Sequence, residues 1–221
     1  MKINDTEKHF LIITVDGAAA TGKSSTAKSL AQKLNFLHID TGKHFRALTY
    51  YFLSEKIEPI NNEVLKTSLA RLITSTCIRE YSAYLKINNK DIAEKDLRTF
   101  EINKYVSKYA SIKPLRDFLL TYQRSLKTFA KENNFTGIVI EGRDIGSIVF
   151  PSAQIKVFLH ADETTRIIRR QNEGQKDFIK KRDSIDQNRK VAPLVCPKDA
   201  ISINTTNHSI EEVVNLIIKK I

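Results

Sequence analysis

Short apolar segments and amphipathic segments alternate along much of the chain. Residues 9–16, "HFLIITVD", are apolar and rich in β-branched side chains, which is typical of a buried parallel strand. Gly17 ends this run. The apolar positions that follow recur at i, i+3, i+4 and i+7 and predict a helix that begins near Lys23: Ala27, Leu30, Ala31 and Leu34.

The strand signal recurs further along the chain. Strands are expected at three further ranges and, more weakly, at a fourth: 35–40, 137–141, 155–160 and 200–204. Helices are expected at 41–53 and at the C-terminus, where Ser209 and Glu212 form a capping box ahead of an apolar stripe. Strands that alternate with helices predict an α/β fold, a parallel sheet flanked by helices on both faces.

Residues 56–103 interrupt this alternation. β-prone stretches there meet the sequence Asn-Asn-Lys-Asp at 88–91, which predicts a small hairpin. We interpret this segment as an insert that stands outside the parallel core.

The length and composition fit one globular domain over residues 1–221. A chain of 221 residues with 41% hydrophobic side chains can bury one substantial core. No stretch approaches the roughly 18 consecutive apolar residues that a membrane span requires. The first ten residues, "MKINDTEKHF", contain two acids and lack the apolar region of a secretory signal. We therefore expect a cytoplasmic protein without a membrane partner.

The chain is strongly basic, with a formal net charge of +11. This charge implies an anionic partner, either nucleic acid or small phosphorylated molecules. Between Arg166 and Lys190, nine Lys or Arg residues stand against four acids. We expect this stretch to form a lid over bound phosphates; a solvated basic helix is the alternative interpretation.

Residues 17–24, "GAAATGKS", satisfy the phosphate-binding pattern GxxxxGK[ST] between the first strand and the first helix. The glycines let the backbone N–H groups point at phosphate oxygens, and the helix N-terminus adds partial positive charge. Lys23 is expected to reach the β- and γ-phosphates, and the Ser24 hydroxyl to hold Mg²⁺. The predicted ATP-binding residues form this loop: Gly17, Ala18, Ala19, Ala20, Thr21, Gly22, Lys23, Ser24 and Ser25.

The loop indicates a nucleoside triphosphate but does not name the reaction. A GTPase would add DxxG and NKxD motifs, and the sequence contains neither. Arg143 and Asp144 directly follow the predicted strand "GIVIE", and ligands of open α/β sheets bind at the carboxyl ends of strands. Arg143 could clamp a phosphate, and Asp144 could accept from an exocyclic amine such as cytosine N4.

Five segments and the C-terminal end together resemble the bacterial cytidylate kinases. In chain order the segments are "DGAAATGKSS", "DTGKHFRALT", "GRDIGSIVFP", "KVFLHA" and "RDSIDQNRKVAPL", followed by "INTTNHSIEEVV". The resemblance runs from about Ile12 to the C-terminus. It implies transfer of the ATP γ-phosphoryl group to CMP or dCMP, with UMP a poorer acceptor.

The resemblance also implies roles for individual residues. By family position, the residues implied to hold the acceptor phosphate are Arg46, Arg143 and Arg189. Those implied to read the cytosine edge are Asp144, Ser107 and Arg116. Those implied to contact the ribose or line the acceptor pocket are Arg182, Asp186 and Thr41. The expected catalytic residues are Lys23, Arg143, Arg189 and, from the basic stretch, Arg170. Arg166 and Arg169 are further candidates for contact with the transferred phosphoryl group.

The implied domain has three parts. They are a core at about 9–55, 104–165 and 191–221, an acceptor-binding insert at about 56–103, and the lid at about 166–190. The sequence departs from the family pattern at Glu141, where Asp is usual, at Ala18, where Pro is common, and at Lys43-His44-Phe45, which replaces a more apolar triplet. The lid is also shorter than in many members.

Phosphoryl transfer passes through a loose transition state with charge spread over the equatorial oxygens, so converging cations and Mg²⁺ suit it. The acceptor phosphate is largely deprotonated at neutral pH, and no general base is expected. The expected partners are ATP and CMP or dCMP, with Mg²⁺ as cofactor, no nucleic acid, and a monomeric enzyme. Two alternatives stay open: another small P-loop kinase for a different nucleotide or metabolite, and a nucleic-acid-binding protein that uses ATP as a switch.

Overall fold

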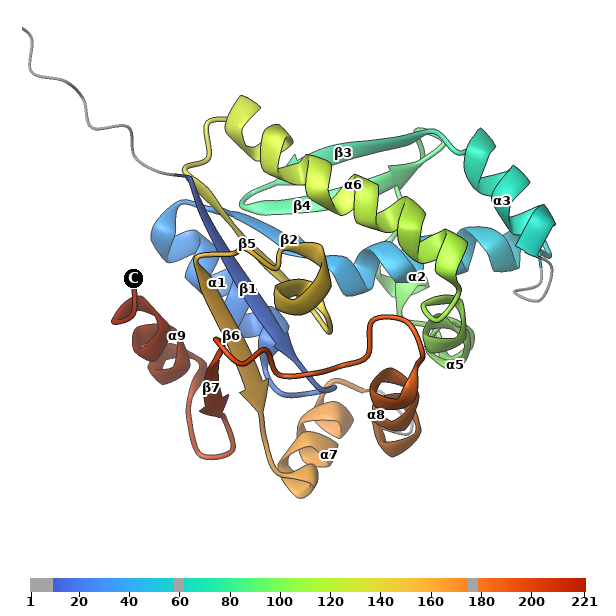
Figure 1. The fold of residues 1–221 in the computed structure, drawn as a ribbon. Coiled ribbons are helices and arrows are strands. Elements are labelled where there is room, and N and C mark those ends of the chain that lie inside the picture. The colour runs from blue at the N-terminus through green and yellow to red at the C-terminus, as the bar shows by residue number, and fades with distance from the viewer. Residues whose placement is uncertain (1–9, 58–61, 175–178) are drawn as a thin grey trace, which may run out of the picture.

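A seven-stranded sheet in the order β3-β4-β2-β5-β1-β6-β7 forms the centre of the fold (Figure 1). The computed structural model describes residues 10–57, 62–174 and 179–221, with only the backbone at 62 and 179–182. The strands are β1 (Leu11–Gly17), β2 (Leu37–Asp40), β3 (Thr74–Arg79), β4 (Ser82–Ile87), β5 (Gly137–Gly142), β6 (Ile155–His160) and β7 (Ile201–Asn204).

Helices lie on both faces and at one end of this sheet. They are α1 (Lys23–Leu34), α2 (Thr41–Ser54), α3 (Asn62–Arg71), α4 (Glu94–Leu97), α5 (Phe100–Tyr109), α6 (Lys113–Glu132), α7 (Glu163–Asn172), α8 (Ile179–Asn188) and α9 (Ile210–Ile218). A π-helical turn, η1 (Ile145–Val149), follows β5. The predicted α/β class, with a parallel sheet and flanking helices, is confirmed.

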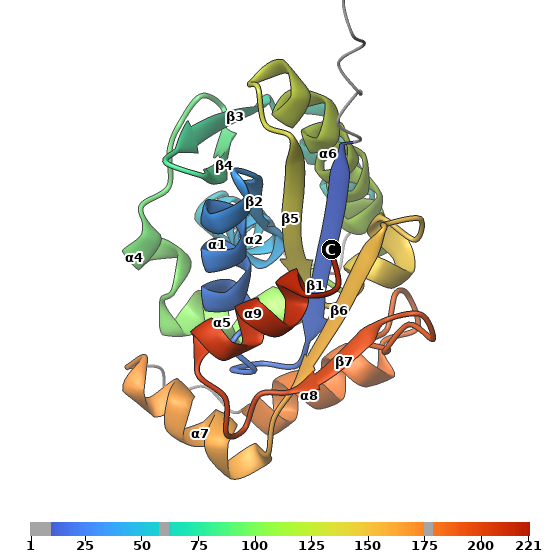
Figure 2. The ribbon, with the colours of Figure 1, turned by 90° about the vertical axis from the view of Figure 1, so that its left-hand side faces the viewer.

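The two faces of the sheet bury separate apolar clusters. Ile13 and Val15 of β1 pack with α1 and α9 on one face, and Ile12 packs with α6 on the other. Figure 2 shows α1 and α9 on the face opposite to α6. Successive side chains of a strand point to opposite faces, so a strand covered on both faces needs an unbroken apolar run. This is why "LIITV" predicts a central strand correctly.

The hairpin β3-β4 corrects one expectation. Its strands pair antiparallel, as predicted, but β4 also pairs in parallel with β2, at His38 with Ser82 and Ile39 with Ala83. The hairpin therefore extends the main sheet, and the prediction that this segment stays outside the parallel core is wrong for β4. The physical reason is that Ala83 joins the apolar cluster of β2 and β5. The role of 56–103 as an acceptor-binding insert stays a prediction.

Helix α6 was not predicted from the sequence. Pro114 stands in its first turn, where the missing N–H costs nothing, and its apolar side chains recur at helical spacing. The buried positions include Leu115, Leu119 and Leu126. This helix also carries Arg116 to the site described below.

His44, on α2, is buried without a polar partner. The side chain is 1% exposed, and neither ring nitrogen has a hydrogen-bond partner among the described residues. Its ring meets that of Tyr122 edge to face, with 5.1 Å between centroids. Burial lowers the pKa of His44 from 6.5 to about 4, so the imidazole stays neutral in the folded protein.

We expect the free energy of unfolding to fall as the pH drops from about 6.5 toward 4. The unfolded chain takes up the His44 proton in this range and the folded protein does not, which favours unfolding. Between about pH 7 and pH 5 the loss from this group is about 2 kcal/mol. Urea unfolding at several pH values, compared between the wild type and His44→Leu, measures it.

The comparison with His44→Leu is needed because Asp16 acts in the opposite direction. Burial raises the pKa of Asp16 from 3.8 to about 6, so the folded protein binds that proton more tightly and this contribution grows as the pH falls. The two proteins share Asp16, and their difference isolates His44. An identical pH dependence in both would contradict the prediction.

Candidate active site

The phosphate-binding loop runs from β1 to α1 in a strongly curved backbone. Gly22 caps α1 with φ 88°, and Ala20 has φ 57°, a left-handed conformation that costs a residue with a Cβ about 1 kcal/mol. A Cβ at Gly17 would lie 2.1 Å from the carbonyl oxygen of Leu159 on β6. Glycine is therefore required at the first position by the neighbouring strand.

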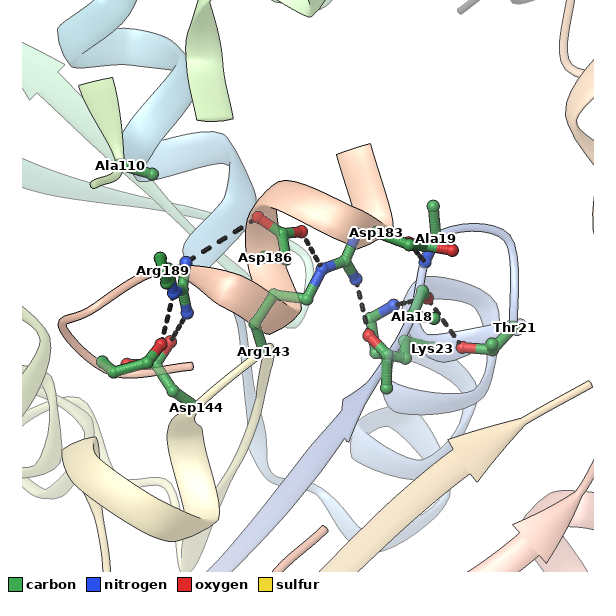
Figure 3. A network of polar contacts seen from close by, with 12 residues as sticks. Ala18, Ala19, Thr21, Lys23, Ala110, Arg143, Asp144, Asp183, Asp186 and Arg189 are labelled. Carbon is green, nitrogen blue, oxygen red and sulfur yellow. Dashed lines mark hydrogen bonds and ion pairs between the residues drawn. The ribbon is translucent and has the colours of Figure 1, made fainter. Parts of the chain in front are cut away.

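Lys23 lies at the N-terminus of α1, folded back over the loop. Its Nζ donates to the carbonyl oxygen of Ala18 at 2.6 Å, and Arg143 Nη1 donates to that of Gly17 at 2.6 Å (Figure 3). Burial and then the Arg143 charge lower the pKa of Lys23 to about 7. An arriving polyanion favours the protonated form, so Lys23 becomes fully charged when phosphate binds.

Ser24 is adjacent to a buried carboxylate. Its hydroxyl donates to Glu141 Oε2 at 2.8 Å, and Glu141, the fifth residue of β5, is 2% exposed. A hydroxyl that donates its proton to a carboxylate keeps its lone pairs for a cation. This pair of hard oxygen ligands beside a phosphate loop fits Mg²⁺, which prefers one or two protein oxygens together with phosphates and water. In the described part of the chain no group of three His, Cys, Asp or Glu residues could hold a metal.

Arg143 and Asp144 follow β5, and each pairs with side chains of opposite charge from other elements. Arg143 Nε donates to Asp186 Oδ2 at 2.8 Å. The Asp144 carboxylate lies between two guanidinium groups, with Arg116 at Oδ2 and Arg189 Nη2 3.1 Å from Oδ1. Asp144 is 4% exposed, and so is the Arg189 side chain. The result is a row of alternating charges, buried or partly buried, that joins β5, α6 and α8. Figure 3 shows Arg143, Asp186, Arg189 and Asp144 in this row.

Asp16 fixes the turn that carries Asp144. Its carboxylate accepts from the backbone N–H groups of Ile145 at 2.8 Å and Gly146 at 2.7 Å. Both residues belong to η1, whose wide hydrogen bonds include Val149 N to Asp144 O at 3.3 Å. Turns of this kind are rare and frequently lie at functional sites.

Helices α7 and α8 approach the loop from the other side. Asp183 Oδ1 accepts from the backbone N–H of Ala19 at 3.1 Å, and its Oδ2 is paired with Arg166. Arg170, 7% exposed, donates to Glu173 at 2.8 Å. Arg169 instead donates to Thr205, to Oγ1 at 3.1 Å and to the carbonyl oxygen at 2.7 Å, so the structure does not bring it to the site.

These groups surround a cavity of about 380 Å³. Fifteen of the predicted site residues line it: Ala19, Ala20, Thr21, Gly22, Lys23, Ser24, Ser25, Thr41, Arg46, Ser107, Arg143, Asp144, Arg170, Asp186 and Arg189. They come from segments far apart in the sequence, and the carboxyl ends of β1, β2 and β5 bring several of them to one edge of the sheet, as expected for an open α/β fold.

Among the predicted residues whose side chains the structure describes, the ones that do not line this cavity are Gly17, Ala18 and Arg116, together with the further candidates Arg166 and Arg169. The carbonyl oxygens of Gly17 and Ala18 accept from Arg143 and Lys23, and Arg116 lies behind Asp144 with a second bond to Ala110 O at 2.9 Å. The side chain of Arg182 lies outside the described residues.

The sequence analysis did not assign several residues that the structure brings to the site. Glu141 precedes Arg143 at a strand end, a position that the strand-end rule could have found. Asp183 lies in the "RDSIDQNR" segment. Lys43, Glu94 and Arg98 line the cavity as a charged group, with 2.7 Å between Lys43 Nζ and Glu94 Oε2 and 2.8 Å between Arg98 Nε and Glu94 Oε1.

Comparison with known proteins agrees with this geometry. A sequence model of the family described as cytidylate kinase matches residues 13–221. The cytidylate kinase of Fusobacterium nucleatum is 38% identical over 222 residues, which cover 96% of this chain and 97% of that protein. Those of Clostridium botulinum (40% over 216 residues, 93% and 94% covered) and Clostridium tetani (39% over 222 residues, 96% and 93% covered) are similarly close. Because the match includes the phosphate loop, the Arg143–Asp144 segment and the Arg189 segment, the chain belongs to the cytidylate kinase family.

Proposed function

We propose that this enzyme transfers the γ-phosphoryl group of ATP to CMP or dCMP, giving ADP and CDP or dCDP. One observation carries the proposal beyond family membership: a single cavity is lined by the phosphate loop and by a carboxylate held between two arginines. The first feature fits a triphosphate, and the second offers an acceptor to the cytosine N4 amine. Another small P-loop kinase is the less favoured alternative.

The donor end binds and orients ATP. The loop N–H groups and the α1 N-terminus bind the phosphates. The Ala19 N–H, which donates to Asp183 in this structure, can donate to a phosphate oxygen once that hydrogen bond breaks. Ser24 and Glu141 would hold Mg²⁺, whose charge offsets that of the β- and γ-phosphates. Lys23 exchanges the Ala18 carbonyl oxygen for a phosphate oxygen.

The acceptor end uses arginines that already hold carboxylates or carbonyls. Arg46 donates to Leu97 O at 2.9 Å and to Asn103 Oδ1 at 2.7 Å, Arg143 pairs with Asp186, and Arg189 pairs with Asp144. We assign the acceptor phosphate to these three guanidinium groups. These partners keep the arginines in place before CMP arrives, so less conformational freedom is lost on binding. We assign Thr41 and Asp186 to the wall of the acceptor pocket, and Ser107 to contact with the cytosine edge.

No side chain is needed as a general base. A phosphate monoester has a second pKa near 6, so the attacking oxygen is already largely unprotonated at neutral pH. The work left to the protein is to bring two polyanions together and to exclude water.

Preference for CMP over UMP, a monomeric state and a cytoplasmic location stay predictions. No helix in the described part of the chain is long and apolar enough to span a membrane.

A coupled assay of ADP release with CMP, dCMP, UMP, AMP and GMP as acceptors tests the proposed function. We expect CMP and dCMP to be the preferred acceptors and turnover to require Mg²⁺. Preference for AMP, for GMP or for a non-nucleotide acceptor would favour the alternative kinase. Salt-sensitive RNA binding without any monophosphate phosphorylation would point to the nucleic-acid-binding alternative.

Replacing Arg170 by alanine is expected to lower kcat by roughly tenfold or more, because its guanidinium lines the cavity from α7 and is suited to the charge that develops on the transferred group. The protein should stay folded, because Glu173, one partner of Arg170, is half exposed and stays hydrated after the change. Steady-state kinetics and thermal melting measure the two effects. Arg169→Ala is the matched control, because Arg169 is bonded to Thr205, and an unaltered kcat in Arg170→Ala would remove Arg170 from the mechanism.

A further inference from the structure

A line of buried hydrogen bonds crosses the sheet beneath the phosphate loop. His38 on β2 contacts Ser82 Oγ on β4 through Nδ1 at 3.0 Å and Glu141 Oε1 on β5 through Nε2 at 3.0 Å. Glu141 Oε2 then accepts from Ser24 on α1 at 2.8 Å. His38 and Ser82 are each 6% exposed, and Glu141 is 2% exposed. Four segments of the chain are joined by three contacts.

Strand register places these groups together. His38 pairs with Ser82 on one side and with Val139 on the other. Glu141 is two residues beyond Val139, on the same face of the sheet, and its side chain reaches back to His38. The pairing of β4 with β2, which the sequence analysis did not foresee, is therefore what brings Ser82 to the histidine.

The histidine holds the oxygen of Glu141 that does not face Ser24. A glutamate has one more rotatable bond than an aspartate, and fixing its side chain costs about 1.5 to 2 kcal/mol of conformational entropy. A side chain of this length needs a second hold to keep one orientation. His38 supplies that hold, because both carboxylate oxygens then have a fixed partner.

We infer that His38 is a positioning residue for nucleotide-bound Mg²⁺, acting through Glu141 on the Ser24 hydroxyl. A carboxylate can only accept, so Nε2 carries a proton and donates to Glu141, and in the neutral imidazole Nδ1 then accepts from the Ser82 hydroxyl. Glu141 in turn orients the Ser24 hydroxyl with its lone pairs toward the loop. Partners behind a metal ligand commonly change metal affinity by about 10- to 100-fold when removed. The inference rests on the proposed function in that it assumes a metal-bound triphosphate in this loop.

Binding of ADP with and without Mg²⁺, measured by calorimetry on His38→Leu, tests the inference. We expect the affinity for ADP to fall roughly tenfold or more when Mg²⁺ is present and to stay unchanged with EDTA. His38→Gln, which can still donate an N–H to Glu141, should restore most of the Mg²⁺-dependent part. A histidine that only fills the core would change both affinities equally or neither, and either result overturns the inference.

A double-mutant cycle shows whether His38 acts through Glu141. In a Glu141→Gln background, the further change His38→Leu should leave the Mg²⁺-dependent affinity unaltered, because the group it orients is already lost. A full additional loss would overturn the inference. If His38→Leu does not fold, Ser82→Ala is the second test, because it keeps the imidazole ring but removes the partner that fixes which ring nitrogen carries the proton. We expect this variant to lose affinity for ADP several-fold in the presence of Mg²⁺ only. An unchanged affinity in the presence of Mg²⁺ would overturn the inference.

These measurements are independent of the acceptor. If CMP is not phosphorylated while His38→Leu still weakens Mg²⁺-dependent ADP binding, the proposed function fails and the positioning role stands. If CMP is phosphorylated and the His38 variants bind ADP like the wild type in both conditions, only the positioning role fails.

Discussion

Replacing Lys23 by methionine is expected to lower kcat by roughly 10²- to 10³-fold while the protein stays folded. Methionine keeps most of the buried aliphatic length and removes the charge. Lys23 is 9% exposed, and its Nζ bonds to the Ala18 carbonyl oxygen at the mouth of the loop. Charge that develops on the transferred group would then lose the cation that the phosphate loop supplies. Coupled ADP-release kinetics and thermal melting give both readings.

The lowered pKa of Lys23 sharpens this prediction. Without nucleotide, burial and the Arg143 charge bring its pKa to about 7, so the side chain is near the point of losing its proton. Removing that charge relieves an electrostatic cost in the free protein, and Lys23→Met should be no less stable than the wild type. A large loss of kcat with unchanged stability separates catalysis from folding.

Lys28→Met is the matched control on the same helix. Lys28 pairs with Glu80 at 3.4 Å, and both side chains are exposed, so this ion pair is worth at most about 1 kcal/mol. Its kinetics should match the wild type. Equal losses in the two variants would show that kcat responds to net charge on α1 rather than to the Lys23 position.

Local features of the sequence were sufficient to predict the strands and the phosphate loop. The apolar run of β1, the glycines at 17 and 22 and the Ser209–Glu212 capping box each depend on neighbouring residues, and the structure confirms all of them. The parallel pairing of β4 with β2 was not predictable in this way, because it depends on burial against strands that lie far away in the sequence. Periodicity describes one segment and contains nothing about its neighbours.

The candidate site shows the same division. Arg143 and Asp144 could be singled out because they follow a strand, but their partners could not. Asp183 meets Ala19 across 164 residues, and Glu141 meets His38 across 103. Each of these contacts requires α8 or β2 to be in position first. Sequence motifs therefore predicted which residues line the cavity better than they predicted which residues hold them there.

Replacing Asp144 by alanine is expected to reduce the preference for CMP over UMP by about 1 to 3 kcal/mol, roughly 5- to 150-fold in the ratio of kcat/KM. Cytosine presents an N4 amine that can donate a hydrogen bond to the carboxylate. Uracil presents a carbonyl oxygen at the same position, and the carboxylate repels that oxygen. Without Asp144 the amine is left unpaired in a buried site, so CMP loses more than UMP. Parallel kinetics with the two acceptors measure the ratio.

The same change also removes the carboxylate shared by Arg116 and Arg189, and it should lower the free energy of unfolding by about 3 kcal/mol. Leu126→Ala on α6 separates the two effects, because Leu126 is 1% exposed, lies outside the cavity lining, and its truncation costs about 2 to 5 kcal/mol. We expect this control to be destabilised to a similar extent with an unchanged CMP to UMP ratio. Asp144→Ala that loses activity equally toward both acceptors would show that the carboxylate only holds the arginines and does not recognise the base.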